Sequence, residues 1–423
     1  MGRDMALLSR SPRWLRVAVW VFACIAYLSA IMSRTSLSAT SAIASDRFSL
    51  TSDDLAAFGI LQLLVYAAAQ IPIGMLVDRL GGRTVLLGGL VIVAVSQVLI
   101  GYGEGFSALL VARALAGLGD AMVFPSAVRL TAVALPTRWT PLGMQSIGIV
   151  GNFGMVITAT PLVMLIDVTS WPTGYAVMAA FTGVVALAAG AVLAMMGRDP
   201  SRTASGESFG SVMRGTVAAM RERGSWLAFS AHLITAAPFT AFVVTWGPLF
   251  LEHGAGFDAG QIGVYLLSIP LIGMVAGLVI GRAIVGRPRV RTGIIVGFVL
   301  LQLVTWTLVL TWPTPTPMFP LVLLAFGLSI GGPASLTAFE ISRDYVAGSL
   351  AARANGVVNT GGFSGALITI WLTGAMLTAQ GAETPDDYSM ELFRVAYLPM
   401  LGLLVVGLVV FILLSRRVGP TQR

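Results

Sequence analysis

The chain has 423 residues, of which 56% are hydrophobic and only 11% are charged, and its mean hydropathy is +0.87. A soluble domain carries roughly a quarter charged residues, so this composition excludes a water-facing surface over the whole chain. The net charge is +7, and all 26 basic residues are arginine. Because these arginines stand in short turns between apolar segments, and not on a basic face with interleaved aromatic residues, we expect no nucleic-acid binding.

Residue types that build metal and disulfide sites are scarce. Cys24 is the single cysteine, and His232 and His253 are the only histidines, so neither a zinc site nor an internal disulfide is expected. The sequence also lacks a Walker motif and a glycine-rich loop in a dinucleotide-binding context. We therefore expect no metal, no cofactor and no enzymatic activity.

Long apolar runs recur along the chain, each near the roughly 20 residues that a membrane-spanning helix needs. In chain order they cover residues 14–42, 54–77, 84–102, 106–135, 141–166, 172–196, 225–251, 259–285, 292–312, 318–341, 351–378 and 391–414. The first run follows several arginines as in a signal peptide, but it lacks a small-residue cleavage site, so we interpret it as a spanning helix. The sequence predicts an all-α integral membrane protein with twelve transmembrane helices.

A polar, basic stretch over residues 198–224 separates the sixth run from the seventh. We therefore predict an N-terminal six-helix bundle over residues 1–197, a linker, and a C-terminal six-helix bundle over residues 225–423. Apolar residues recur at helical spacing within the stretch, from Phe209 to Met220. This pattern favours either an amphipathic helix on the membrane surface or a plain solvated linker, and the sequence leaves both open.

Arginines are unequally divided between the two sides of the predicted bundles. The chain ends, residues 198–224 and every second loop hold most of them, whereas the opposite loops offer only Arg47 and Arg394 among many acidic residues. By the positive-inside rule, both termini and the linker are expected in the cytoplasm and the protein in the inner (plasma) membrane.

The loop between the second and third runs carries a spaced motif that ends in Asp-Arg and a glycine turn. It resembles the G-x-x-x-D-R-x-G-x-R loop of the major facilitator superfamily, and its matching residues are Gly74, Asp78, Arg79, Gly81 and Arg83. Glycines at the turn let the chain reverse tightly. The resemblance implies two bundles around a solute site near the membrane midplane, with these five residues in a gate. A degraded copy without the acid covers the end of the eighth run and the turn after it, at Gly277, Gly281-Arg282 and Gly286-Arg287.

Two further gate residues are expected on the same side. We expect Asp78 to contact Arg129 and the cytoplasmic start of the eleventh helix, and Glu340 to join Arg343 and Asp344 in an ion network. Small-residue stripes in the fifth and eleventh runs resemble family motifs that let helices approach closely. Their members are Gly148, Gly151 and Gly154, and Gly356, Gly361, Gly362 and Gly365.

The first four runs resemble one branch of the superfamily, the anion:cation symporters, which include sugar-acid and organic-anion carriers. Arg34 opens an R-x-x-L-S match in the first run, and the second run matches Y-x-x-x-Q-x-P-x-G from Tyr66 to Gly74. In the fourth run Arg113 opens R-x-x-x-G-x-x-E, followed by F-P-x-x-x-R ending at Arg129. Asp120 stands where the branch has glutamate, so the acid is kept with a shorter reach.

Charged residues inside these runs carry the functional argument, because a charge at membrane depth costs several kcal/mol unless it faces a cavity or a partner. Arg113 and Asp120 are seven residues apart, so they share one helix face. Two arginines and an acid suit an anionic solute, held by Arg34 and Arg113, with Asp120 exchanging a proton. The alternative is a structural ion network between the first and fourth helices.

Neutral polar residues complete the expected solute site: Tyr66, Gln70, Asn152, His232 and Asn359. His232 also fits a hydrogen-bonded packing residue. Family carriers of phosphate esters place an arginine in the seventh helix, and this sequence has none there, which disfavours a phosphate ester as the solute.

These features predict a secondary transporter that moves a small organic anion, such as a sugar acid or carboxylate, by proton-coupled alternating access. Its partners are expected to be that anionic solute, protons and the lipid bilayer, and the protein is expected to be a monomer. Two alternatives stay open at this point: a proton-coupled drug or metabolite efflux pump, and a transporter-like membrane sensor.

Overall fold

The computed structural model describes residues 12–50, 52–196, 209–347, 350–382 and 387–418. Within these ranges the chain is helical and contains no strand, because a backbone surrounded by lipid must satisfy its N–H and C=O groups internally. Twelve of the described helical segments are long and apolar enough to cross a membrane. Each overlaps one predicted run, with ends that differ by a few residues, so the predicted fold class is confirmed.

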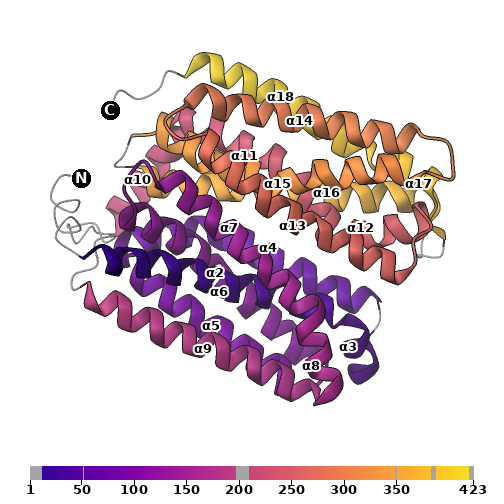
Figure 1. Ribbon diagram of the computed structural model, residues 1–423, viewed down its shortest axis with the longest axis horizontal. Helices are drawn as coiled ribbons and strands as arrows, with labels where there is room; N and C mark the ends of the chain where they lie inside the picture. The colour runs from indigo at the N-terminus through magenta and orange to yellow at the C-terminus, as the bar shows by residue number, and fades with distance from the viewer. Residues whose placement is uncertain (1–11, 51, 197–208, 348–349, 383–386, 419–423) are drawn as a thin grey trace. The chain divides into compact units, whose positions relative to one another are not determined.

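The chain divides into two compact units (Figure 1). The first comprises Met1–Ala218 and Gly348–Gly356, and the second comprises Ala219–Ala347 and Val357–Arg423. Helices of the first unit are α2 (Arg13–Ala39), α3 (Ser41–Phe48), α4 (Ser52–Leu80), α5 (Gly82–Tyr102), α6 (Gly105–Ala134), α7 (Thr140–Ile157), η1 (Thr158–Leu162), α8 (Val163–Val168) and α9 (Trp171–Met195).

Glycines set the closest helix crossings of the first unit. A Cβ added at Gly89 on α5 would lie 2.8 Å from the Cβ of Met122 and 2.9 Å from the carbonyl oxygen of Gly119, both on α6. One added at Gly154 on α7 would lie 2.9 Å from the carbonyl oxygen of Leu28 on α2. Without a side chain at these positions the helix backbones meet directly, which is how helices associate tightly in a membrane.

The second unit contains the remaining spanning helices. They are α11 (Arg223–Ala241), η2 (Phe242–Trp246), α12 (Gly247–Leu249), η3 (Phe250–Gly254), α13 (Ala259–Ala283), α14 (Pro288–Thr311), α15 (Met318–Tyr345), α16 (Ala351–Ala379) from Val357 onward, α17 (Met390–Ala396) and α18 (Leu398–Arg417). Aromatic rings fill the core of this unit, with Trp306 and Tyr397 4.4 Å apart between ring centroids and Phe250 packed against both. Such ring contacts add to the stabilisation from burial.

Two spanning segments contain π-helical turns. In one, η1 joins α7 to α8 and contains Pro161; in the other, η2 follows Pro238 and η3 follows Pro248. Proline lacks the N–H that an α-helix needs, so the ladder of hydrogen bonds widens locally and the helix continues. In each of the two segments the helix therefore continues through its π-helical turns as a single membrane span.

The glycine stripe expected in the eleventh helix faces two different neighbours. Gly361 and Gly365 on α16 approach Phe229 and Leu233 of α11. Gly356 instead approaches α4, where an added Cβ would lie 3.3 Å from the carbonyl oxygen of Gln70. This approach accounts for the grouping of residues 348–356 with the first unit.

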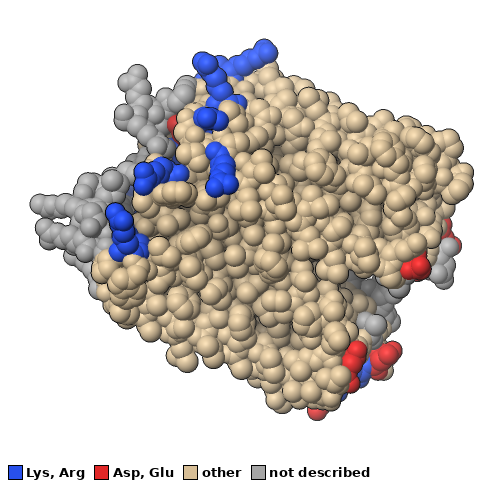
Figure 2. All heavy atoms as spheres, in the orientation of Figure 1, with Lys and Arg blue, Asp and Glu red and all other residues tan. Residues whose placement is uncertain are grey.

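Charged side chains gather at the helix ends. On the face drawn in Figure 2, most visible arginines gather at one end of the helices and most visible acidic side chains at the other, with an uncharged band between them. Large apolar side chains are exposed within such bands, for example Val184 and Leu187 on α9. An apolar outer face is what a lipid-facing helix requires. Cys24, the single cysteine, is buried on α2.

Part of the expected linker forms α10 (Phe209–Arg221). Met213, Val217 and Met220 are exposed along it at helical spacing, and Arg214 and Arg221 are also exposed. The helix has the composition of an amphipathic surface helix. Residues 198–208 of the linker lie outside the described residues, as do Arg3, Arg10 and Arg423, so the predicted bundle boundaries at 197 and 225 stay predictions.

Candidate functional site

A buried ion pair joins α2 to α6. The Nε of Arg34 donates to the Oδ2 of Asp120 over 2.7 Å, and the two side chains are 18% and 1% exposed. Asp120 stands fifteen residues after Gly105 and fourteen before Ala134, which places it at the midpoint of α6. The pair therefore lies well inside the spanning segment and away from the charged helix ends.

Arg113 lies two helical turns before Asp120 and is bound to the backbone of α2. Its two terminal nitrogens donate to the carbonyl oxygens of Ser33, at 3.2 Å, and Arg34, at 3.0 Å. The side chain is 2% exposed. Because these carbonyls sit next to Arg34, Arg113 fixes the height and rotation of α2 at the point where the ion pair forms. The geometry of Arg113 is therefore compatible with two roles: it can position Arg34, and it can contact a solute directly.

Two atoms of this cluster have unused hydrogen-bonding capacity. The Oδ1 of Asp120 and the Nε of Arg113 are buried without a hydrogen-bond partner among the described residues. Burial of a carboxylate oxygen without a hydrogen-bond partner costs free energy. Protonation of Asp120, or a hydrogen-bond donor on a bound molecule, would reduce that cost. When all three residues are ionised, two guanidinium groups face one carboxylate and the cluster carries one net positive charge.

Tyrosine and threonine side chains surround the cluster. The guanidinium of Arg34 lies 5.1 Å from the ring centroid of Tyr66, and the Tyr27 hydroxyl also hydrogen-bonds to Arg34. Thr35 and Thr158 share a hydrogen bond of 2.8 Å between α2 and η1. Sequence reasoning missed Tyr27 and Thr158. Tyr27 precedes Arg34 by seven residues, so helical spacing alone could have placed both side chains on one face.

Two of the expected neutral residues lie near this cluster in the first unit. Gln70 is fully buried on α4, where its side-chain nitrogen donates to the carbonyl oxygen of Tyr66 over 3.2 Å. Asn152 is half-buried on α7, next to Gly151, which packs against Tyr27. The structure thus gathers Arg34, Tyr66, Gln70, Arg113 and Asp120 from three helices, with Asn152 on a fourth.

His232 and Asn359 come together in the second unit. The Nδ1 of His232, on α11, lies 3.0 Å from the carbonyl oxygen of Ser335 on α15, and its ring also hydrogen-bonds to the Asn359 side chain of α16. Phe339 packs edge-on against the imidazole, with 5.1 Å between centroids. A histidine held by a carbonyl, an amide and an aromatic ring joins three helices, which favours the packing role for His232.

The Asp-Arg loop has the geometry expected of a helix latch. The Oδ2 of Asp78 lies 3.2 Å from the Nε of Arg353 near the start of α16, within the first unit. Gly81 begins the reversal with a φ of +87°, which glycine adopts without strain. Arg83 donates to the carbonyl oxygen of Leu193 at the end of α9, over 3.3 Å. Gly74 is buried facing Gly356, and Arg79 is exposed.

Of the partners predicted for Asp78, the structure places the start of the eleventh helix against it, through Arg353. Arg129 is half-buried on α6, nine residues after Asp120.

A second ion network lies in the second unit. Arg291 on α14 is buried and pairs with Asp344 and with Glu340, whose Oε2 lies 3.6 Å from its NH2 nitrogen. Arg343 donates to the other oxygen of Glu340 over 3.0 Å. Glu340, Arg343 and Asp344 therefore form one network, as expected, and its centre is Arg291. That residue escaped sequence reasoning because it stands among exposed arginines of the same loop.

Comparison with known proteins agrees with this arrangement. The family model described as Major Facilitator Superfamily matches residues 23–370. The Probable sulfoacetate transporter SauU of Cupriavidus necator is 25% identical over 363 residues, which cover 80% of this chain and 82% of that protein. Multidrug resistance protein 1 of Bacillus subtilis is 25% identical over 233 residues, covering 53% of this chain and 55% of its own.

A solved structure of the human organic anion transporter MFSD10 is similar in fold. It matches with a TM-score of 0.66 at 15% sequence identity, and the match covers 96% of this chain and 100% of that chain. At that identity the likeness bears on the fold alone. The family match extends from Ala23 to Ile370 and so includes the buried cluster on α2 and α6, the Asp-Arg loop and most of α16.

Proposed function

This chain belongs to the Major Facilitator Superfamily, and we propose that it moves a small organic anion across the membrane together with protons, by binding the anion at the Arg34–Asp120–Arg113 cluster. The chain is a multi-pass membrane protein of a transporter family. The finer proposal concerns what it carries and how transport is driven. It also places the protein in an inner membrane with both termini and α10 on the cytoplasmic side, as the arginine distribution favours.

The observation that carries the proposal is the unbalanced charge of the cluster. Arg113 and Asp120 are buried in the middle of a spanning bundle and Arg34 is half-buried beside them, and the three together carry one net positive charge when ionised. An uncompensated charge at membrane depth costs several kcal/mol, so a bound anion would remove a penalty that the empty site bears. Arginine suits this role because its planar fork can hold a carboxylate or sulfonate by two hydrogen bonds.

Proton coupling follows from the position of Asp120. Its Oδ2 accepts the hydrogen bond from Arg34, whereas its Oδ1 is buried without a hydrogen-bond partner among the described residues. A proton on Asp120 would neutralise the carboxylate, loosen its hold on Arg34 and raise the net charge of the cluster to two. The cluster then balances a dianion, whereas with Asp120 ionised it balances a monoanion. Solute and proton would therefore favour each other's binding, which is the thermodynamic requirement for symport.

The relatives support an organic anion over other solutes. Sulfoacetate, the solute in the name of the Cupriavidus necator relative, is a small molecule with one sulfonate and one carboxylate. We propose a solute of this class, with one or two acidic groups on a short carbon frame. Sulfonates, carboxylates and sugar acids are the compounds to test first.

The test is uptake into proteoliposomes that contain the purified chain. A labelled organic anion should accumulate when the exterior is more acidic than the interior, and a protonophore should abolish the accumulation. Unlabelled sulfonates and carboxylates should compete, whereas neutral sugars should not. If no organic anion in the panel competes or accumulates in either direction, the proposed solute class is wrong.

Proton-coupled drug efflux is the second candidate, favoured by the resemblance to a multidrug resistance protein over about half of the chain. Trp246, an aromatic residue that could contact such solutes, is 8% exposed, and its indole donates to the carbonyl oxygen of Ile370 over 3.1 Å. Inverted vesicles separate the two candidates. Dye extrusion that persists in Arg34→Ala would support efflux through a site other than the charged cluster.

A further inference from the structure

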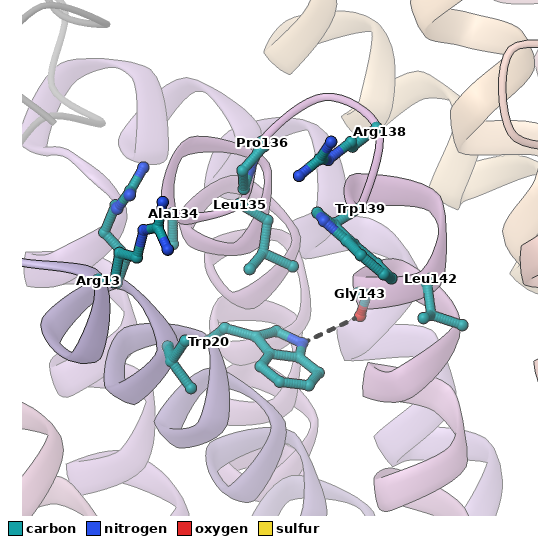
Figure 3. A pocket seen from close by; sticks show the side chains of 11 residues that line it. Arg13, Trp20, Ala134, Leu135, Pro136, Arg138, Trp139, Leu142 and Gly143 are labelled. Atoms are coloured by element: carbon teal, nitrogen blue, oxygen red, sulfur yellow. Dashed lines mark hydrogen bonds between the residues drawn. The ribbon is translucent and has the colours of Figure 1, made fainter. Parts of the chain in front are cut away.

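A pocket opens in the first unit, at the end of α2 opposite to Arg34 (Figure 3). The N-terminal turns of α2, the end of α6 and the α6–α7 turn with the start of α7 enclose a cavity of about 430 Å³. Arg16 lines it and stands eighteen residues before Arg34, so roughly 27 Å of helix separate this pocket from the charged cluster. It is therefore distinct from the proposed transport site.

The pocket has an apolar body and a basic rim. Figure 3 shows Arg13 on one side and Arg138 with Trp139 on the other, with Trp20 and Leu135 between them. No acidic residue lines the cavity. Arg13, Arg16 and Arg138 form no ion pair with any described residue, and the Nε of Arg16 is buried without a hydrogen-bond partner among them.

Two helices, α2 and α7, begin at this pocket, and α6 ends there. Neither α2 nor α7 has an acidic residue in its first turn, and neither has a side-chain cap at its N-terminus. Helix N-termini attract anions because their first N–H groups and the helix dipole point outward. The three arginines and the start of α2 thus favour negative charge at a place where no acidic residue lines the cavity.

The location of the pocket identifies the kind of anion. Its lining includes Arg13 and Arg16 in the first turns of α2, where the first candidate membrane span begins. Trp139 is 49% exposed beside it, and tryptophan prefers the level of the lipid headgroups. We propose that the pocket binds one anionic phospholipid, with its phosphate among Arg13, Arg16 and Arg138 and the upper part of an acyl chain along Trp20, Leu135 and Leu142.

This occupant fits better than the other molecules available at that position. A free inorganic anion would fill the rim but leave the apolar body empty. The N-terminal residues 1–11 carry Arg3 and Arg10 against a single acid, Asp4, so a basic rim would repel them on balance. A bound phospholipid supplies both the missing negative charge and the apolar filling. It would also bridge α2 to the α6–α7 turn, next to the hydrogen bond that the Trp20 indole donates to the carbonyl oxygen of Gly143 on α7 over 3.4 Å.

The test measures thermal stability of the full-length chain in detergent, with phosphatidylglycerol, phosphatidylcholine or inorganic phosphate added. We expect phosphatidylglycerol to raise the unfolding temperature, phosphatidylcholine to raise it less and phosphate to leave it unchanged. Arg16→Gln/Arg138→Gln should lose at least half of the phosphatidylglycerol shift. Arg289→Gln, which removes an exposed arginine outside the pocket, should keep the full shift.

A second variant separates a bound lipid from general attraction to a basic surface. Leu142→Trp keeps every arginine but fills the apolar body, so it should also lose the shift and retain fewer phosphatidylglycerol molecules in native mass spectra. An undiminished shift in both variants, or an equal shift with inorganic phosphate, would overturn the proposal. A shift that appears only after residues 1–11 are deleted would show that the chain's own terminus occupies the pocket, and would overturn it as well.

Discussion

Arg113 donates hydrogen bonds to the carbonyl oxygens of Ser33 and Arg34, which belong to the two peptide groups that flank the Cα of Arg34, so the residue that sets the position of Arg34 lies on the same helix as its ion-pair partner, Asp120. Rotation of α2 about its axis would break the hydrogen bonds from Arg113 and the ion pair together. The cluster can therefore respond to a ligand as one unit, which is how a binding event could be passed to helix movement.

Asp120→Asn should uncouple transport from the proton gradient. The amide keeps the size of the side chain and can still accept from Arg34, but it cannot exchange a proton. We expect substrate exchange across the membrane to persist and accumulation against a gradient to disappear, measured in proteoliposomes with an imposed pH step. Asp167→Asn, an exposed acid at a helix end, serves as the control. Continued accumulation by Asp120→Asn would make this residue a structural partner of the arginines.

Arg34→Ala should lose binding of the anion while the protein still reaches the membrane. A hydrogen bond to a charged group is worth about 1.5–3 kcal/mol, so affinity should fall by at least roughly tenfold. Calorimetric titration of the purified variant with the transported anion measures this. Arg47→Ala removes an exposed arginine at the end of α3 and should leave affinity unchanged. Equal affinities for Arg34→Ala and the wild type would contradict the proposed anion site.

Asp78→Asn should slow turnover with little effect on the equilibrium affinity for solute. The carboxylate of Asp78 forms an ion pair with Arg353. This pair joins the end of α4 to the start of α16 and includes no residue of the charged cluster. Arg353→Gln should have the same effect, and the double variant should be no slower than either single one, because both remove one interaction. Transport rates and binding constants for the three proteins check this. A tenfold loss of affinity at normal turnover would place Asp78 in the binding site.

Gly89→Val should destabilise the first unit. A Cβ at this position would meet the Cβ of Met122 and the carbonyl oxygen of Gly119, neither of which can rotate away. Overpacking of this kind costs about 1–3 kcal/mol, so the thermal unfolding temperature should fall. Gly183→Val is the matched control, since no atom lies within 4 Å of an added Cβ there. A normal unfolding temperature for Gly89→Val would mean that α5 and α6 separate without strain.

The spanning helices were predictable from sequence because each is a long apolar run, and the bilayer leaves such a run no alternative to a helix. Their contacts were predictable only where a motif fixed the spacing, as for Asp78 and the start of the eleventh helix. The ion pair between Arg34 and Asp120 is one that the sequence offered as an alternative, an ion network between the first and fourth helices.

Other features could not be read from the sequence for physical reasons. The hydrogen bonds from Arg113 to Ser33 and Arg34 are accepted by backbone carbonyls, which every residue has, so no pattern of side chains in the sequence predicts them. The role of Arg291 depends on burial, and its neighbours Arg287 and Arg289 share its residue type but are exposed. The basic pocket combines the start of α2 with the α6–α7 turn, more than a hundred residues away in the chain.

The single cysteine, buried on α2, makes this protein convenient for reporter chemistry. Since the chain has no lysine and its only thiol is shielded, amine reagents have no side-chain target and maleimides find few competing sites. A cysteine introduced at the exposed Ser170 would carry a fluorophore at one defined position without prior removal of Cys24. Helix movement during transport could then be followed by fluorescence in a background that retains every native residue of the charged cluster.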